Sequence, residues 1–333
     1  MGCATPPAPE ASELKRFEFS QPEMGVPFRI VLYAKNSEEA ERAATAAFKR
    51  ISDLNEKLSD YETDSELNQL SRTSGQGKAV PVSDDLWRVL EKAQEIASRS
   101  DGAFDVTVGP CVVLWRRARR LKELPSPAAL TNALRAVGYK KMLLNKSMHS
   151  VQLLVPDMKL DLGGIAKGFA ADEALKTLRG LGIRRALVAA SGDIAVSAAP
   201  PGKRGWRIEV APLDIPNPPP KRFVSLANAA VSTSGDMFQR LEINGKRYSH
   251  IVDPRTGIGL TDHSLVTTIA KDGMTADAIS KVVAIGGHVT GFPMIEKIPG
   301  AAAFVVRKPA EQIETFEMPG FAKFWIKNEM PPD

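Results

Sequence analysis

The sequence predicts one α+β domain, with mixed sheets flanked by helices. Segments typical of strands and of amphipathic helices follow one another without strict βαβ alternation, which favours α+β over a doubly wound sheet. The chain has 333 residues, of which 43% are hydrophobic, so it can bury a sizeable core. We expect a flexible tether at 1–20, a single domain at 21–327 and a tail at 328–333.

The first third of the chain carries two helix patterns after a strand. "PFRIVLYA" at 27–34 is rich in β-branched and aromatic residues, which predicts a strand. Asn36 or Ser37 can then cap a helix whose apolar residues recur at spacings of three and four. The polar stretch 58–71 predicts a loop, and a second amphipathic helix begins near Ser83.

The middle of the chain is predicted from shorter signals. "DGAFDVTVGP" at 101–110 predicts a turn and a short strand that stops at Gly-Pro, and 126–138 predicts a short helix. "SVQLLV" at 150–155 and "MKLDL" at 158–162 predict a hairpin. "RRALVAASGDIAVSA" at 184–198 predicts two strands around a glycine break.

The last third mixes strands with one helix. "WRIEVA" at 206–211 predicts a strand, and the Pro-rich stretch 212–222 predicts a surface excursion. A helix is expected from about Thr275 to Ile285, followed by a late strand, "AAAFVVR", at 301–307.

The charge and cysteine content narrow the function classes. The net charge of +5 suits a small anionic ligand and is too mild to indicate nucleic acid. The basic run 115–122 predicts a solvated helix face rather than a membrane or nucleic-acid patch. Neither cysteine lies in a C-x-x-C pair, which argues against a zinc or redox motif, and Cys111 is expected to pack as a small hydrophobe.

Cys3 suggests an attachment to a membrane. "MGC" precedes a Pro/Ala-rich stretch and resembles the end of a bacterial lipoprotein signal, although the hydrophobic segment that should come before it is not in this sequence. The interpretation is a lipidated inner-membrane lipoprotein on the periplasmic side of a bacterial cell envelope. The alternative is a chance Gly-Cys.

Glycines stand beside polar residues in five places. They are "FDVTVGP", "DLGGIAKG", "ASGDI", "TSGD" and "YSHIVDPRTG". Such turns let a ligand approach the backbone while a side chain fixes it, so five of them predict loops that converge on an acceptor-rich ligand. "DLGGIAKG" fits either a phosphate loop at a helix start or a tight turn in which Gly163 and Gly164 supply unusual backbone angles.

His250 is the one histidine in such a motif, three residues before Asp253. A serine hydrolase is not indicated because no G-x-S-x-G elbow occurs. Histidine-based zinc spacing is absent too, which leaves a hard cation held by oxygen atoms as the plausible metal chemistry.

Together these motifs resemble the FAD:protein FMN transferases, also called ApbE flavin transferases, over nearly the whole chain. The most specific matches are "DLGGIAKGFAAD", "TSGD" and "YSHIVDPRTG". The resemblance implies an ApbE-like (T-fold-like) fold with FAD bound between converging loops. It implies that a Thr or Ser hydroxyl of a target protein, such as a respiratory or redox membrane protein, takes FMN from FAD while AMP leaves.

The resemblance also implies site residues. His250 and Asp253 would be catalytic, and Mg²⁺ would be held by the Ala166 carbonyl and Asp277. The implied FAD contacts come from all five motifs and two earlier positions: Met24, Tyr61, Asp105, Thr107, Lys167, Gly168, Gly192, Asp193, Ser234, Gly235, Asp236, His250, Arg255 and Thr256.

Lys281 departs from the family pattern, which places Thr or Ser four residues after the metal-binding aspartate. An ammonium cannot ligate a metal, so the Mg²⁺ site is in doubt. Lys281 could turn inward, where it would pair with Asp277 or touch the pyrophosphate, or it could snorkel outward and cost the site one ligand. Two alternative functions follow: an FAD-binding protein with little transferase activity, and an FAD pyrophosphatase that gives FMN and AMP.

Overall fold

A computed structural model describes residues 13–213, 221–235, 240–309 and 312–326. Its centre is an eight-stranded sheet in which each strand runs antiparallel to its neighbours. The order across the sheet is β1 (Lys15–Glu23), β2 (Val26–Ala34), β6 (Ala186–Ala190), β7 (Asp193–Val196), β10 (Ala229–Gly235), β15 (Ser264–Ala270), β16 (Ala302–Arg307) and β17 (Glu314–Glu317). The α+β class is confirmed.

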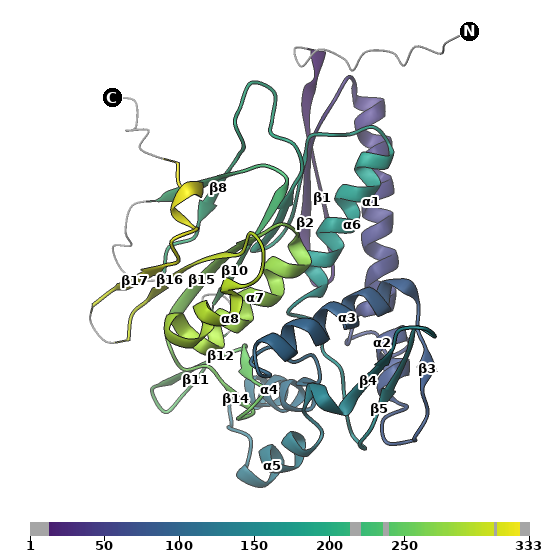
Figure 1. Ribbon diagram of the computed structural model, residues 1–333, viewed down its shortest axis with the longest axis vertical. Coiled ribbons are helices and arrows are strands. Elements are labelled where there is room, and N and C mark those ends of the chain that lie inside the picture. The colour runs from purple at the N-terminus through teal and green to yellow at the C-terminus, as the bar shows by residue number, and fades with distance from the viewer. Residues whose placement is uncertain (1–12, 214–220, 236–239, 310–311, 327–333) are drawn as a thin grey trace.

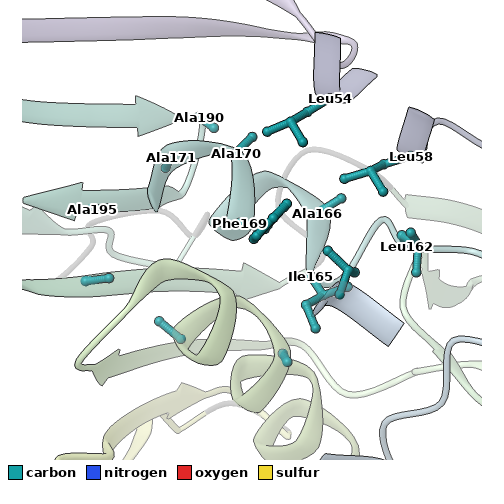
Figure 2. Close-up of a cluster of buried hydrophobic side chains, with 14 of the residues drawn as sticks. Leu54, Leu58, Leu162, Ile165, Ala166, Phe169, Ala170, Ala171, Ala190 and Ala195 are labelled. Carbon is teal, nitrogen blue, oxygen red and sulfur yellow. The ribbon is translucent and has the colours of Figure 1, made fainter. Parts of the chain in front are cut away.

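Helices cover one face of this sheet (Figure 1). They are α1 (Ser37–Leu58), α6 (Ala166–Gly180), α7 (Gly273–Gly286) and α8 (Phe292–Glu296), with a π-helical turn at Gly287–Gly291 between the last two. Their buried side chains and those of the strands form the main core. Figure 2 shows its centre, where Phe169 of α6 lies near Leu54 of α1 and the sheet residues Ala190 and Ala195.

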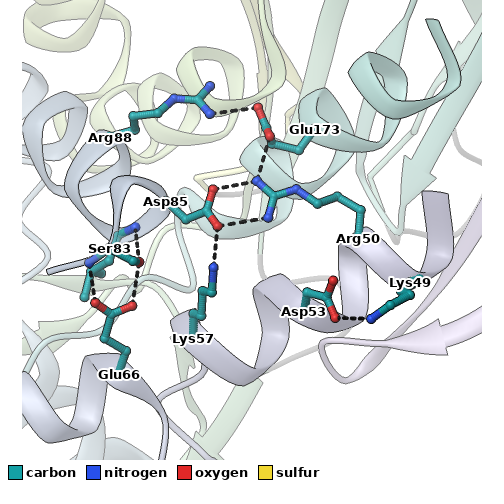
Figure 3. A network of polar contacts seen from close by, with 10 residues as sticks. Lys49, Arg50, Asp53, Lys57, Glu66, Ser83, Asp85, Arg88 and Glu173 are labelled. Carbon is teal, nitrogen blue, oxygen red and sulfur yellow. Dashed lines mark hydrogen bonds and ion pairs between the residues drawn. The ribbon is translucent and has the colours of Figure 1, made fainter. Parts of the chain in front are cut away.

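Helix α1 illustrates how the sequence sets an element. Asn36 accepts a hydrogen bond from the Glu39 N–H at 2.9 Å and caps the N-terminus, as predicted. Phe48, Ile51 and Leu54 are buried on one stripe, as their spacing requires. Helices α1, α6 and α3 (Asp84–Arg99) are further joined by ion pairs, in which Arg50 binds both Asp85 and Glu173 (Figure 3).

A hairpin covers the opposite face of the large sheet. It consists of β8 (Trp206–Val210) and β9 (Arg222–Leu226). A 3₁₀ turn near the C-terminus, at Ala322–Phe324, contacts β9. Trp206, Ile208 and Val224 pack against sheet residues to form a second core. The alternation of buried and exposed residues along β8 is the pattern expected of a strand with one wet face.

A lower lobe extends beyond one end of the sheet (Figure 1). One part holds α2 (Glu66–Ser71), α3 (Asp84–Arg99) and a small sheet of β3 (Val80–Pro81), β5 (Ser150–Leu153) and β4 (Met142–Asn145). The other part holds α4 (Gly109–Leu121), α5 (Pro127–Arg135), the 3₁₀ turn Tyr139–Lys141, and the hairpins β11 (Arg240–Ile243) with β12 (Lys246–Ser249) and β13 (Val252–Asp253) with β14 (Ile258–Gly259).

Five predictions need correction. The tether cannot reach residue 20, because β1 begins at Lys15. The stretch 58–71 contains helix α2, which Ser65 caps through the Asn68 N–H. Segment 101–110 forms turns and a single bridging residue before α4, with Pro110 in the first helical turn, where proline is tolerated. Strand β5 pairs with β4 and β3 rather than with 158–162. The helix predicted over 126–138 ends at Arg135.

Three of the predicted features lie wholly or mostly outside the described residues. They are Cys3, the tail at 328–333 and most of the Pro-rich excursion.

Helix α7 continues through the π turn to Glu296, and this span is apolar and long enough to cross a membrane by length and composition. In the fold, α7 packs between α6 and the strands β10 and β15. Nine of its residues are buried, including Asp277 and Ser280. Its apolar character is therefore that of a core helix.

Candidate functional site

Two turns and the end of a strand meet at one end of the large sheet. The register pairs Phe28 of β2 with Ala190 of β6, and Ser232 of β10 with Asp193 of β7. Met24 in the β1–β2 turn, Gly192 in the β6–β7 turn and Gly235 at the end of β10 therefore lie at the same end of the sheet. Asp236, the next predicted contact, lies outside the described residues.

The segment "DLGGIAKG" forms the start of a helix. Helix α6 begins at Ala166, and no side chain caps its N-terminus. Neither Gly163 nor Gly164 has a positive φ, so the expectation of unusual angles is wrong. Close packing accounts for the glycine at position 164. A β-carbon there would lie 3.3 Å from the Phe104 ring and 3.4 Å from Lys281 Cε. The segment therefore joins the helix N-terminus closely to α7.

Four charged side chains form a buried cluster at this helix start. Lys167 Nζ lies 2.7 Å from Asp193 Oδ2 and 3.7 Å from Asp277 Oδ2. Lys281 donates to Asp277 Oδ1. The Gly168 N–H donates to Asp277 Oδ2 at 3.2 Å. Of the two arrangements considered for Lys281, the structure has the inward one, paired with Asp277.

The cluster contains two lysines and two aspartates, so its formal charges balance. Burial would raise the pKa of Asp193, but the attraction of Lys167 and Lys281 outweighs it and lowers that pKa. Burial would likewise lower the pKa of Lys167, but Asp193 and Asp277 raise it well above its usual range. Ser232 donates to Asp193 Oδ1 at 2.6 Å and supports the carboxylate from β10. Two ammonium groups thus offset two carboxylates.

The residues that the resemblance assigns to Mg²⁺ do not fit a divalent cation in this arrangement. Both oxygens of Asp277 already accept hydrogen bonds, from Lys281 and from the Gly168 N–H. No group of three or more His, Cys, Asp or Glu side chains that could hold a metal occurs among the described residues. A dication at Asp277 would also meet two ammonium groups within a few ångströms, which is electrostatically unfavourable.

Arg116 forms a clamp that sequence reasoning missed. Its guanidinium binds Asp60 and donates to Asp161 Oδ2 at 3.1 Å, and its Cζ lies 4.1 Å from the centroid of the Tyr61 ring. Asp161 also accepts the Gly163 N–H at 2.8 Å. The clamp therefore links the exposed ring of Tyr61 to the loop before α6. The basic run was predicted as a solvated face, which is wrong for Arg116.

A cleft of about 460 Å³ opens beside this clamp. Its lining includes Asp60, Tyr61, Asn68, Met158 and Lys159. Its volume lies within the range of small-molecule sites, and most of its lining residues are polar or charged, with Tyr61 and Met158 as the large apolar surfaces. Asn68 is held by the carbonyls of Asp60 and Glu62, so this wall is preorganised.

Asp105 and Thr107 bind each other and the segment at Gly138 and Tyr139. Asp105 Oδ1 accepts the N–H and the hydroxyl of Thr107, and Oδ2 accepts the Tyr139 N–H at 2.6 Å. The Thr107 hydroxyl accepts the Gly138 N–H at 2.7 Å. Both side chains are buried, so their contribution is to shape the loop; contact with FAD remains a prediction.

The loop after His250 packs against α4. Trp115 Nε1 donates to the Gly257 carbonyl at 2.7 Å. Cys111 is buried beside Gly257, which agrees with the prediction that it packs as a small hydrophobic residue. Burial raises the pKa of the Cys111 thiol to about 11, so the thiol is unreactive at neutral pH.

His250 and Asp253 differ in what they can do. His250 is exposed at the end of β12. Both oxygens of Asp253 accept hydrogen bonds from Arg255, through Nε at 2.9 Å and Nη2 at 2.8 Å. Asp253 therefore organises its turn, and its role as a catalytic residue stays a prediction. The Thr256 N–H donates to the Asp253 carbonyl and completes the turn.

The comparisons with known proteins match this picture. The family model described as "ApbE family" matches residues 24–305. This chain belongs to the ApbE family. Among its relatives, the FAD:protein FMN transferase of Haemophilus influenzae is 30% identical over 263 residues, covering 77% of this chain and 76% of the relative. That of Treponema pallidum is 30% identical over 306 residues, covering 87% and 84%.

Solved ApbE structures share the fold. The flavin transferase ApbE from Vibrio cholerae superposes with a TM-score of 0.84 at 25% identity, covering 93% of this chain and 99% of that one. The ApbE protein from Thermotoga maritima has a TM-score of 0.82 at 28% identity, covering 94% and 100%. The ApbE fold predicted from the motifs is confirmed.

Proposed function

We propose that this chain is an FAD:protein FMN transferase. It moves FMN from FAD to a Thr or Ser hydroxyl of a target protein. The hydroxyl oxygen attacks the phosphorus on the flavin side, the bond from that phosphorus to the bridging oxygen breaks, and AMP leaves with the electron pair. The hydroxyl proton passes to a base, and the product is a phosphoester between FMN and the target.

The observation that carries this proposal is the junction of α6, β7 and α7 in an ApbE-family chain. A helix N-terminus, two lysine ammonium groups and the turn at Gly192 lie together there. These are the groups that bind and neutralise a pyrophosphate. The cleft beside Tyr61 suits the flat flavin ring, because an exposed aromatic ring is a stacking surface.

His250 is our choice for the contact to the reacting phosphate or for the proton acceptor. Its exposed position at the end of β12 leaves it accessible to a target protein. An imidazole is suited to accepting a proton near neutral pH. Asp253 and Arg255 act together to fix the turn that follows it.

We also propose where the protein works. The Gly-Cys before a Pro/Ala-rich stretch supports a lipidated Cys3 and an inner-membrane lipoprotein on the periplasmic side of a bacterial cell envelope. A transferase tethered in that way would meet respiratory or redox membrane proteins, which are the targets we propose. Palmitate labelling of the protein in a bacterial host, compared with that of Cys3→Ala, tests the anchor.

The transfer itself can be tested directly. The purified chain is incubated with FAD and with a soluble domain of a candidate redox membrane protein, and the denatured mixture is resolved on a gel. We expect flavin fluorescence on the target band and a mass increase equal to one FMN minus water. Absence of covalent flavin with every candidate domain, despite FAD binding, would favour the binding-protein alternative that Lys281 raises.

A further inference from the structure

We propose that the ammonium group of Lys281 takes the place of a divalent metal in this chain, so that FAD binds and reacts without Mg²⁺. The inference rests on the proposed function, because it concerns the pyrophosphate of the same FAD. It is carried by four residues that the structure brings together, Lys167, Asp193, Asp277 and Lys281. We call them the charge cluster.

The first step is the position of Lys281. It lies one helical turn after Asp277 on α7, and its stem packs on Gly164, where a β-carbon would lie 3.4 Å from Lys281 Cε. The side chain therefore runs along the loop that precedes α6. Its ammonium group is held at the start of a helix, which is where a phosphate binds.

The second step is which groups of the charge cluster face outward. The Asp277 and Asp193 side chains are 0% and 7% exposed, whereas those of Lys281 and Lys167 are 16% and 21% exposed. The carboxylates thus lie beneath the ammonium groups. A ligand that approaches the helix start meets positive charge first, which attracts a pyrophosphate and repels a dication.

The third step is that every oxygen of the two carboxylates already accepts a hydrogen bond or pairs with an ammonium group. Asp277 accepts from Lys281 and from the Gly168 N–H, and Asp193 accepts from Lys167 and from Ser232. A metal would have to displace an ammonium from a buried carboxylate and leave that ammonium unpaired, which is costly.

The chemistry of an ammonium suits the same task. It is a compact point charge with three N–H donors, and hydrogen bonds from a charged donor to a phosphate are among the stronger ones. As the bond between phosphorus and the bridging oxygen breaks, negative charge grows on the oxygen that leaves with AMP. Lys281 and Lys167 would stabilise that charge from fixed positions.

The test measures metal binding and FAD binding separately from transfer. The free Mn²⁺ signal in electron paramagnetic resonance is titrated with the wild-type chain in saturating FAD, and FAD affinity is measured by flavin fluorescence with EDTA and with saturating Mg²⁺. We expect no stoichiometric Mn²⁺ site in the wild type. We expect its FAD affinity to be the same in EDTA and in Mg²⁺ within about twofold.

Lys281→Thr supplies the opposite case, because threonine can ligate a metal. We expect this variant to gain an FAD-dependent Mn²⁺ site and to bind FAD about 10- to 100-fold more weakly in EDTA than the wild type. Lys49→Thr is the matched control, since Lys49 forms an exposed helical ion pair with Asp53 at 2.8 Å and four residues' spacing. The control should behave as the wild type.

The outcomes separate the inference from the proposed function. A wild-type chain that binds one Mn²⁺ per FAD as tightly as Lys281→Thr overturns the inference, whatever its transfer activity. So does a wild-type chain that transfers FMN only when Mg²⁺ is added. A chain that does not bind FAD under either condition contradicts the proposed function instead. The wild-type titration decides the matter by itself if the variant does not fold.

Discussion

Gly168 on α6 and Gly273 at the start of α7 touch backbone to backbone. A β-carbon on Gly273 would lie 2.6 Å from the Gly168 carbonyl oxygen, and one on Gly168 would overlap the Gly273 carbonyl. This close crossing brings the Gly168 N–H within 3.2 Å of Asp277. The charge cluster is assembled where two helices approach as closely as glycine allows.

Replacing Gly168 with alanine should therefore destabilise the fold. We expect Gly168→Ala to lower the free energy of unfolding by about 1–3 kcal/mol, because the methyl group forces α6 and α7 apart. Gly180→Ala is the matched control at the other end of α6, where a β-carbon meets nothing within 4 Å. It should be neutral or stabilising by up to about 1 kcal/mol. Urea unfolding followed by circular dichroism measures both, and equal effects would disprove the close crossing.

Arg116→Ala should weaken FAD binding. The change frees Tyr61 and Asp161 from their shared partner, so both the ring and the loop before α6 lose a fixed position. We expect the dissociation constant for FAD to rise about tenfold or more, since hydrogen bonds to charged groups are lost. Arg117→Ala, at the exposed neighbouring position, is the control. An Arg116→Ala affinity equal to that of Arg117→Ala would remove the clamp from the account.

His250→Ala should reduce FMN transfer with little effect on folding. A general base or a contact to the reacting phosphate contributes about 10²- to 10⁴-fold to a rate. Because His250 is exposed, its loss should change the free energy of unfolding by no more than about 0.5 kcal/mol. Single-turnover transfer rates and urea unfolding are compared with those of His149→Ala, which should keep the full rate. Full activity in His250→Ala would exclude this residue from the mechanism.

Asp172 should make stability depend on pH. It accepts the N–H groups of Gly273 and Met274, yet burial raises its pKa from 3.8 to about 7, with Asp272 and Glu173 adding to the effect. The folded state thus holds the proton more tightly than the unfolded state. The resulting stabilisation is complete below the unfolded-state pKa of about 4 and is lost as pH rises through about 7.

Asp172→Asn provides the reference for that titration. We expect the unfolding free energy of the wild type, minus that of Asp172→Asn, to fall by about 1–4 kcal/mol between pH 4 and pH 8. Urea unfolding at a series of pH values gives this difference. A difference that stays flat or rises with pH would contradict the raised pKa.

The regular elements could be read from the sequence because they depend on local patterns. The capping residues Asn36 and Ser83 begin α1 and α3 as predicted, and the alternation at 206–210 gives strand β8. Helix α2 was not predicted because it is only six residues long and mostly polar. Tertiary packing rather than hydrophobic periodicity determines that this segment is helical. The pairing of β5 was predicted wrongly because a hydrophobic pattern does not indicate which strand lies beside which.

The site was predictable only in part for the same reason. Motifs identified Lys167, Asp193 and Asp277, because each stands beside a glycine turn or in a family pattern. The role of Arg116 depends on Asp60 and Asp161, which are 56 and 45 residues away in the chain. Ser232 and Ser280 are fully buried serines whose hydrogen-bond partners lie on other elements, so their local sequence does not reveal their role.

The fate of FAD distinguishes a transferase from a pyrophosphatase and from a protein that only binds FAD. The chain is incubated with FAD and a target domain, and AMP, free FMN and protein-linked FMN are quantified in one sample by liquid chromatography and mass spectrometry. A transferase predicts that AMP appears in equal amount to protein-linked FMN, with little free FMN. AMP that matches free FMN would show a pyrophosphatase, and no AMP at all would show a protein that only binds FAD; either result would contradict the account.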